Sequence, residues 1–238
     1  MKKNFLKRFR SLTEDDLLSD MHLHTAWTDG EASLNEMVAE AVRKGLKRIA
    51  FTDHVRDAST YCMSFENEID EISAKSAIHV HAGFEAKIRD FDGNLDLPSY
   101  CSRERHLIIG SVHSIPVGGG EFMHPQIFKS PEELRKSEYE LYMALIKSGQ
   151  AAILGHVGGM SNRFAGSFSH EYLEGIISSC AKTQTAFEIN SRYHLDMMDE
   201  LVPLLEKYDP YVSIGSDAHK PGEVGGCNEL LNKHYRMK

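Results

Sequence analysis

The sequence lacks any long apolar run, and no stretch approaches the roughly 18 apolar residues of a membrane-spanning helix. Its basic start, MKKNFLKRFR, is followed by SLTEDDLLSD, where a signal peptide would have its apolar segment. The cysteines are Cys62, Cys101, Cys180 and Cys227. No two of them form a C-x-x-C pair, which is typical of reduced thiols rather than of a disulfide framework. These absences predict a cytoplasmic protein without a membrane partner.

An excess of positive charge is also missing. The chain has 27 Lys and Arg residues against 35 Asp and Glu residues, so 27 − 35 gives a net charge of −8 with histidine neutral. Binding to nucleic acid is therefore unexpected, because no basic surplus exists to displace counterions. The 238 residues, 41% of them hydrophobic, suit one globular domain. We expect a single domain over residues 1–238, with a core at about 16–226, and a homo-oligomer is compatible with this composition.

Short apolar runs typical of strands alternate with helix-like stretches along the chain. The predicted strands are Asp20–Thr25, Arg48–His54, Ala77–Ile88, His106–Ile115, Ala151–Val157, Gln184–Asn190 and Tyr211–His219. The predicted helices are 33–45, 64–75, 130–149, 169–182 and 196–208. This alternation predicts an α/β fold with parallel strands, which a closed barrel and an open sheet both satisfy. No G-x-G-x-x-G follows the first strand, so dinucleotide binding is disfavoured.

Metal-ligand residue types recur at the ends of six of these seven strands. They are His22, His24, His54, Glu85, His113, His156, Asp217 and His219. Histidine, present 13 times, is the commonest metal ligand. Functional residues of α/β barrels gather at the C-terminal ends of the strands. A single histidine of this kind would be interpreted as a buried core residue, but their shared position favours a metal site.

The spacing of these residues supports the same interpretation. His22 and His24 are two positions apart, so on a strand their side chains project from one face and can share an ion. Asp217 and His219 repeat this spacing near the other end of the chain. The carboxylate of Glu85 can bridge two ions through its two oxygens.

Seven short motifs occur in an order that is highly specific as a set. They are D-M-H-L-H-T at 20–25, T-D-G at 28–30, T-D-H at 52–54, G-F-E at 83–85, G-S-V-H-S at 110–114, G-H at 155–156 and G-S-D-A-H at 215–219. Together they resemble the polymerase-and-histidinol-phosphatase (PHP) family over about residues 20–226. The resemblance implies a distorted seven-stranded (β/α) TIM-like barrel with a three-metal cluster at the C-terminal face of its strands.

The resemblance also implies a ligand set for each of three divalent ions. The first ion would be held by His22, His24, Glu85 and Asp217, the second by Glu85, His113 and His156, and the third by Asp29, His54 and His219. Asp29 stands where some family members have a histidine, so occupancy or metal preference would differ at the third site. Mixed imidazole and carboxylate ligation suits Zn, Mn or Fe and does not select among them.

Clustered divalent ions predict a metal-dependent phosphoesterase. They would bind the ester oxygens and lower the pKa of a shared water toward ~7, so that a metal-bound hydroxide attacks phosphorus in line. No Ser or Cys nucleophile is required, and the sequence has no G-x-S-x-G. We expect hydrolysis of a small phosphate monoester, histidinol phosphate or a similar metabolite, with Asp217 and His219 among the catalytic residues.

Three basic residues outside the ligand sets are candidates for substrate binding. Arg163 follows His156, and Arg192 follows the sixth predicted strand. Both positions resemble phosphate-binding arginines of the histidinol-phosphatase branch, and a guanidinium can hold phosphate bidentately. A solvated loop arginine explains each of them equally well. His124 lies in the glycine-rich segment 117–125, which would either cover the substrate or form a surface loop.

Five further residues have predicted roles near the site. His194, two residues after Arg192, is a catalytic candidate that could reach the leaving group. Asp20 and Asp53 are expected to orient the ligand histidines. Glu188 or Glu121 would supply an acidic contact to the amino group of histidinol phosphate.

Three alternatives remain open. A phosphodiesterase or exonuclease is the first, since PHP modules also accompany DNA polymerases, but the charge of −8 and the absence of a basic, aromatic-rich groove argue against it. A phosphotyrosine phosphatase of the same family is the second, and its characteristic motifs are not found. The third is a non-catalytic metal-binding regulatory module, against which the nearly complete ligand set argues.

Overall fold

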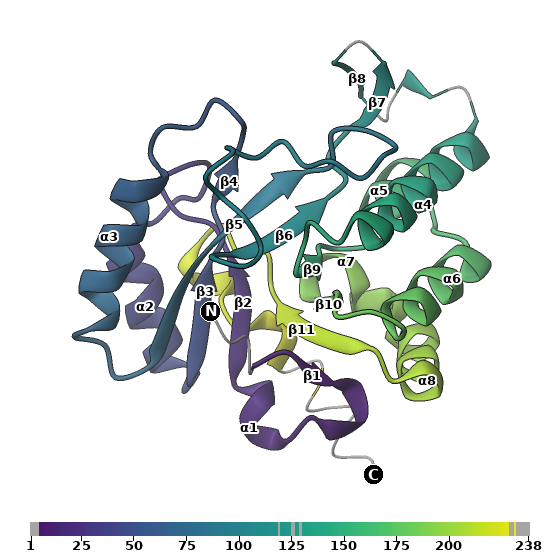
Figure 1. The fold of residues 1–238 in the computed structure, drawn as a ribbon. Helices are drawn as coiled ribbons and strands as arrows, with labels where there is room; N and C mark the ends of the chain where they lie inside the picture. Colours follow the sequence, from purple (N-terminus) through teal and green to yellow (C-terminus); the bar gives the residue numbers. More distant parts are fainter. Residues whose placement is uncertain (1–4, 119, 125–126, 129, 229–230, 232–238) are drawn as a thin grey trace.

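A mostly parallel β-sheet runs through the centre of the computed structural model, and helices pack around it (Figure 1). The structure describes residues 5–118, 120–124, 127–128, 130–228 and 231. Its strands are β1 (Lys7–Arg8), β2 (Ser19–Leu23), β3 (Arg48–Phe51), β4 (His54–Val55), β5 (His79–Lys87), β6 (Leu107–Ser111), β7 (Ile115–Gly118), β8 (Glu121–Met123), β9 (Ile153–Leu154), β10 (Ala186–Asn190) and β11 (Tyr211–Gly215). The predicted α/β fold with parallel strands is confirmed.

The helices flank the sheet in Figure 1, with α2 and α3 to its left and α4, α5, α6 and α8 to its right. The α-helices are α1 (Glu14–Leu17), α2 (Leu34–Arg43), α3 (Cys62–Ser73), α4 (Pro131–Ser148), α5 (Gly159–Ala165), α6 (His170–Cys180), α7 (Ser191–His194) and α8 (Met198–Tyr208). The 3₁₀ helices are η1 (Phe9–Ser11), η3 (Leu195–Met197) and η4 (Pro221–Glu223). No helix in the described part of the chain combines the length and the apolar character needed to cross a bilayer.

The sheet follows the order β1-β11-β10-β9-β6-β5-β3-β2, and β4 pairs with β5. Its strand pairs are parallel except for β1 with β11. Two backbone hydrogen bonds connect the end of β2 with the segment that follows β11: His24 N donates to Ala218 O at 2.9 Å, and Asp217 N donates to His22 O at 3.0 Å. These bonds bring the first and last parallel strands together, although they are far apart in sequence.

The predicted helix boundaries are confirmed where capping residues mark them. Ser33 and Glu36 form the capping box that begins α2. Ser130 accepts a hydrogen bond from Glu133 N at the start of α4, and Pro131 occupies the first turn. Gly149 ends α4 in the left-handed conformation, with φ of 67°, which glycine adopts without a steric penalty.

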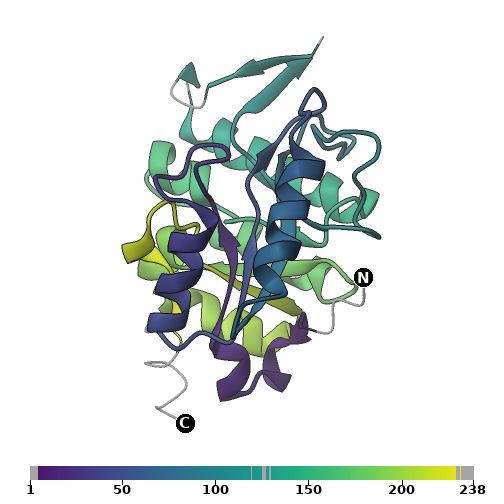
Figure 2. The same ribbon diagram turned by 90° about the vertical axis from the view of Figure 1, so that its left-hand side faces the viewer.

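Several strands are shorter than predicted. The segment Arg48–His54 divides into β3 and β4, and β9 covers only two residues of Ala151–Val157. Two short helices, α5 and α7, form where the sequence predicts irregular connections. The sequence does not reveal them because seven and four residues are too few to display a helical apolar period. The glycine-rich segment forms the β7–β8 hairpin, which projects from one end of the molecule (Figures 1 and 2); Gly119 and Pro125 lie outside the described residues.

Candidate metal centre

Glu85, near the end of β5, is the centre of the candidate site. Its side chain is 1% exposed, and the ring nitrogens of five histidines surround its carboxylate. The nitrogen-to-oxygen distances are 2.9 Å to His54 Nδ1, 3.0 Å to His156 Nε2, 3.1 Å to His113 Nε2, 3.5 Å to His24 Nε2 and 3.6 Å to His22 Nε2. These histidines lie on or just after four strands other than β5, so the parallel sheet brings together the residues that the sequence places at strand ends.

The first predicted ligand set is assembled on one side of Glu85. His22 Nε2 and His24 Nε2 lie 3.1 Å apart. Asp217 Oδ1 lies 3.2 Å from His24 Nε2 and 3.7 Å from His22 Nε2. Ligand atoms of His22, His24 and Glu85 all lie within 4.8 Å of one another, a spacing that a single ion can span.

The second predicted set is also brought together, with one addition. His113 and His156 both approach Glu85 Oε1, and their ring centroids are 5.4 Å apart. His54 joins this group, since its ligand atom lies within 4.8 Å of those of Glu85 and His113. His54 therefore faces both the second and the third predicted sets.

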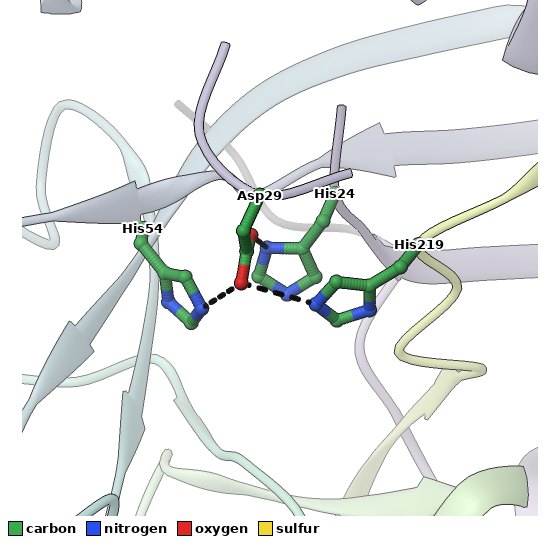
Figure 3. Close-up of side chains that lie close together, drawn as sticks. All are labelled: His24, Asp29, His54 and His219. Carbon is green, nitrogen blue, oxygen red and sulfur yellow. Dashed lines mark ion pairs between the residues drawn. The ribbon is translucent and has the colours of Figure 1, made fainter. Parts of the chain in front are cut away.

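Asp29 is the centre of the third predicted set, where three histidine rings converge on its carboxylate (Figure 3). Asp29 Oδ2 lies 3.2 Å from His54 Nε2 and 3.4 Å from His219 Nε2. His24 is an additional neighbour, with its Nδ1 atom 3.6 Å from Asp29 Oδ1. Asp29 thus makes with its carboxylate the contacts expected of a ligand at this position.

The residues present fit a metal centre. His24 Nδ1 is buried and has no hydrogen-bond partner in the described part of the chain, which is unusual for a buried polar atom. An ion at this nitrogen would satisfy it. Imidazole nitrogens and carboxylate oxygens together form a donor set that transition metals of the Zn, Mn and Fe type accept.

The close packing of acids and histidines shifts their pKa values strongly. Burial opposes the ionisation of Glu85, but His113 and His22 hold its pKa well below the usual value. Burial opposes protonation of His54, but Asp29 and Glu85 raise its pKa to about 10. Burial lowers the pKa of His24 to about 4. Glu85 is therefore an anion and His24 a neutral imidazole, the forms in which these groups bind metal, whereas His54 would have to release a proton to bind an ion.

Asp20 and Asp53, expected to orient the ligand histidines, do not contact the histidine rings, but Asp20 Oδ1 accepts a hydrogen bond from the main chain of one of them, His22 N, at 3.4 Å. Asp20 accepts hydrogen bonds from Ser216 N at 2.9 Å, from Ser216 Oγ at 2.6 Å and from Gly225 N at 2.7 Å. Asp53 accepts from Thr25 N at 3.0 Å and from Thr28 Oγ1 at 2.8 Å. Both aspartates fix the loops that carry ligand-type residues rather than the rings themselves.

Glu188, on β10, is fully buried, so the predicted contact between its carboxylate and a substrate amino group is wrong. Its Oε1 atom lies 2.7 Å from His22 Nδ1. Its Oε2 atom accepts from His156 N at 2.6 Å and from Asn190 Nδ2 at 3.1 Å. Both carboxylate oxygens are therefore occupied by groups of the protein.

A cavity of about 300 Å³ opens beside the second ligand set. Its lining residues are His113, His124, His156, Gly159, Met160, Arg163, Phe164 and Tyr193. Two substrate-binding candidates, His124 and Arg163, thus face one cavity. Tyr193 is a lining residue that the sequence does not reveal, because an isolated aromatic after Arg192 carries no motif; its ring centroid lies 4.8 Å from that of His156.

Arg192 and His194 lie on the same short helix, α7, but only Arg192 faces the site. Arg192 Nη1 lies 3.6 Å from Asp217 Oδ2, and its Nη2 donates to Glu223 Oε2 at 3.0 Å. His194 is fully buried, and its two ring nitrogens are hydrogen-bonded to Asn190 N at 3.1 Å and Val157 O at 2.8 Å. Burial lowers the pKa of His194 to about 4. The predicted catalytic role of His194 is wrong, because no nitrogen of the ring is available to a substrate.

The remaining catalytic candidates, Asp217 and His219, are held next to each other. His219 Nδ1 lies 2.9 Å from the main-chain oxygen of Asp217, which directs His219 Nε2 toward Asp29. The side chain of His219 is 22% exposed, whereas the rings of His22 and His24 are fully buried. Of these three histidines, His219 is the one that solvent reaches.

Comparisons with known proteins identify a family and several relatives of the chain. The family model described as PHP domain matches residues 20–192. A "Probable phosphatase" of Caldicellulosiruptor bescii is 28% identical over 224 residues, covering 90% of this chain and 84% of that protein. "Probable phosphatase YcdX" of Escherichia coli K12 is 26% identical over 222 residues, covering 89% of this chain and 82% of that protein.

A solved structure with the same fold is that of histidinol phosphate phosphatase from Lactococcus lactis, complexed with zinc, L-histidinol and phosphate. It matches with a TM-score of 0.67 at 20% identity, covering 90% of this chain and 92% of that chain. At this level of identity, the likeness establishes the fold of the chain.

Proposed function

Because the chain belongs to the PHP domain family, we propose that it is a metal-dependent phosphatase that hydrolyses a small phosphate monoester. The observation that carries this proposal is the convergence of five histidine nitrogens on the buried carboxylate of Glu85. An anion so enclosed is typical of a bridging metal ligand. The names of the curated relatives support a phosphatase as the class of enzyme.

Three divalent ions are the proposed cofactors, with Zn, Mn and Fe as candidates. The proposed ligands are those of the three predicted sets, and the geometry adds His54 to the second set and His24 to the third. When bound, such ions neutralise ester oxygens and lower the pKa of coordinated water. The hydrogen bonds between β2 and the segment after β11 support a closed, seven-stranded barrel in one domain, with the ligands at one end of it.

The protein's own residues would orient the ester. Arg163 and His124 line the cavity beside His113 and His156, and Arg192 approaches from the side of Asp217. A guanidinium at either position would hold the phosphoryl oxygens that do not react. Asp217 and His219 are proposed to take part in catalysis through the ions that they hold: the contact of His219 Nδ1 with Asp217 O fixes the ring and turns Nε2 toward Asp29, while part of the side chain stays open to solvent.

Histidinol phosphate is the first substrate to test, since the Lactococcus lactis protein of the same fold was complexed with L-histidinol and phosphate. The purified protein would be assayed for phosphate release from histidinol phosphate, sugar phosphates, nucleotides, a phosphotyrosine peptide and a single-stranded oligonucleotide, beside elemental analysis. Release of phosphate from small monoesters, lost on chelation and restored by Zn, Mn or Fe, is expected. Bound metal without turnover of any of these compounds would contradict the proposal, as would activity on the oligonucleotide alone.

A further inference from the structure

Glu188 touches two of the proposed ligand sets at once, although it is not itself a proposed ligand. We propose that Glu188 is a positioning residue that fixes the tautomer of His22 and the backbone of His156, and thereby couples the first and second ions. This inference rests on the proposed metal centre. It concerns affinity for metal, so it can be tested apart from the substrate.

Three hydrogen-bond donors converge on the Glu188 carboxylate. Oε1 faces His22 Nδ1 at 2.7 Å, and Oε2 faces His156 N at 2.6 Å and Asn190 Nδ2 at 3.1 Å. The side chain is fully buried, so water does not replace any of these partners. A carboxylate is the side-chain group that accepts at both of its terminal atoms, and an amide of the same shape accepts at only one.

The contact with Oε1 determines which nitrogen of His22 can bind an ion. Because Nδ1 donates its proton to Glu188, the neutral ring must carry its lone pair on Nε2. Nε2 is the atom that lies 3.1 Å from His24 Nε2 and 3.6 Å from Glu85 Oε1. Glu188 therefore directs the lone pair of His22 toward the first ligand set.

The contact with Oε2 holds the second ligand set through the main chain. His156 has a φ of 30°, a backbone conformation that residues other than glycine rarely adopt. The 2.6 Å bond from His156 N to Glu188 keeps this backbone in place, and it presents Nε2 to Glu85 Oε1 at 3.0 Å.

The neighbourhood of Glu188 leaves room for this carboxylate and for little else. A Cβ atom on Gly215 would lie 2.3 Å from Glu188 Oε1 and 2.7 Å from His22 Cβ. Glycine at this position of β11 is therefore required for the carboxylate to reach His22. The third ligand set, Asp29, His54 and His219, includes none of the three residues bonded to Glu188 in the described part of the chain.

Replacing Glu188 by glutamine tests the proposal with minimal change in shape. The amide would present NH₂ either to His22 Nδ1 or to His156 N, so one donor must lose its acceptor or His22 must change tautomer. Substitution of a residue that supports a metal ligand lowers metal affinity by roughly 10- to 100-fold. We expect E188Q to show this loss for two ions per chain, while the third ion is retained.

Glu138 offers a matched control. It is also fully buried, and it accepts from Ser161 N at 2.8 Å and from Met160 N at 3.3 Å, neither of which is a proposed ligand. E138Q makes the same side-chain substitution in the interior and is expected to keep the metal content and affinity of the wild type. Both variants and the wild type would be compared by elemental analysis after dialysis, by chelator competition and by the visible spectrum of the Co²⁺-loaded protein.

The outcomes separate this inference from the proposed function. If E188Q binds as many ions as the wild type with the same affinity, the inference is overturned and the proposed metal centre stands. If the wild type binds no ion, both are overturned. Should E188Q fail to fold, ¹⁵N NMR of the zinc-loaded wild type decides: a proton on His22 Nδ1 supports the inference, and a proton on Nε2 refutes it.

Discussion

Arg192 Nη1 lies 3.6 Å from Asp217 Oδ2, so a residue proposed to hold the substrate phosphate reaches a residue proposed to hold an ion. The second amino group of Arg192 is bonded to Glu223 Oε2 at 3.0 Å, which keeps the guanidinium at the edge of the site. This arrangement places a cation beside a proposed metal ligand, as the proposed role of Arg192 in holding phosphoryl oxygens requires.

Substitution of Arg192 by alanine is therefore expected to weaken substrate binding. Loss of a hydrogen bond to a charged group costs about 1.5–3 kcal/mol, or roughly a 10- to 100-fold rise in KM for phosphate monoesters. Arg43→Ala is the control, since Arg43 is an arginine of α2 paired with Glu40. KM would be measured by steady-state kinetics, and an unchanged KM in R192A would contradict a role for Arg192 in substrate binding.

Substitution of His113 by alanine is expected to reduce bound metal and turnover together, because His113 Nε2 lies 3.1 Å from Glu85 and belongs to the second ligand set. Loss of at least one ion per chain and a fall in kcat of at least about 100-fold are expected. His79→Ala, at the exposed start of β5, should change neither quantity. A H113A protein with full metal content and full turnover would refute the assignment.

Substitution of Gly215 by alanine is expected to destabilise the protein and to distort the first ligand set. The added Cβ would lie 2.3 Å from Glu188 Oε1 and 2.7 Å from His22 Cβ, and such overpacking costs about 1–3 kcal/mol. At Gly222, by contrast, nothing lies within 4 Å of an added Cβ, so G222A is the matched control. Urea unfolding would measure both, and equal stability of the two variants would contradict the described packing.

The contacts of Asp16 predict that the free energy of unfolding changes with pH for a reason unrelated to the metal centre. Its Oδ2 atom accepts from Lys7 Nζ at 2.9 Å and from Thr13 N at 2.9 Å. Burial opposes ionisation of Asp16, but Lys7 and Thr13 hold its pKa below the usual value. A lowered pKa means that the charged form stabilises the fold above the unfolded pKa of about 3.9, and this contribution is lost as the pH falls through the folded pKa.

Asp16→Asn is therefore expected to lower the free energy of unfolding at neutral pH by about 0.5–2 kcal/mol, as loss of a helix-capping interaction does. The difference from the wild type should disappear in strong acid, where Asp16 is protonated. Asp15→Asn is the control, because Asp15 and its partner Lys47 are both largely exposed. If the free energy of unfolding of D16N stays below that of the wild type by the same amount from neutral pH into strong acid, the role of the charge is refuted.

The sequence predicts which ligand-type residues come together because they obey a simple rule. Alternation along a strand places His22 and His24 on one face, and parallel strands carry residues such as Glu85 and His113 to the same end of a sheet. These relationships follow from strand geometry alone. For the same reason, the parallel α/β arrangement is predictable from the order of the elements.

The sequence does not reveal which polar groups become buried or what they contact there. Asp53 and Glu188 have the same chemistry, yet Asp53 binds a loop and Glu188 binds the ring of His22. His194 is two residues from Arg192, but the turn of α7 directs it into the core. The short helix α5 also escapes prediction, since it begins after Gly158 in the left-handed conformation and is too brief to show an apolar period.

The backbones of His156 and Asp217 have a consequence for efforts to improve the protein. Among the described residues, three other than glycine have positive φ angles: His156 at 30°, Asp209 at 51° and Asp217 at 56°. Such conformations cost on the order of 1–3 kcal/mol each, and two of the three carry proposed ligands. Selection for heat resistance alone would therefore favour glycine at two positions that carry proposed ligands, so we expect thermostability and metal binding to conflict at these two residues.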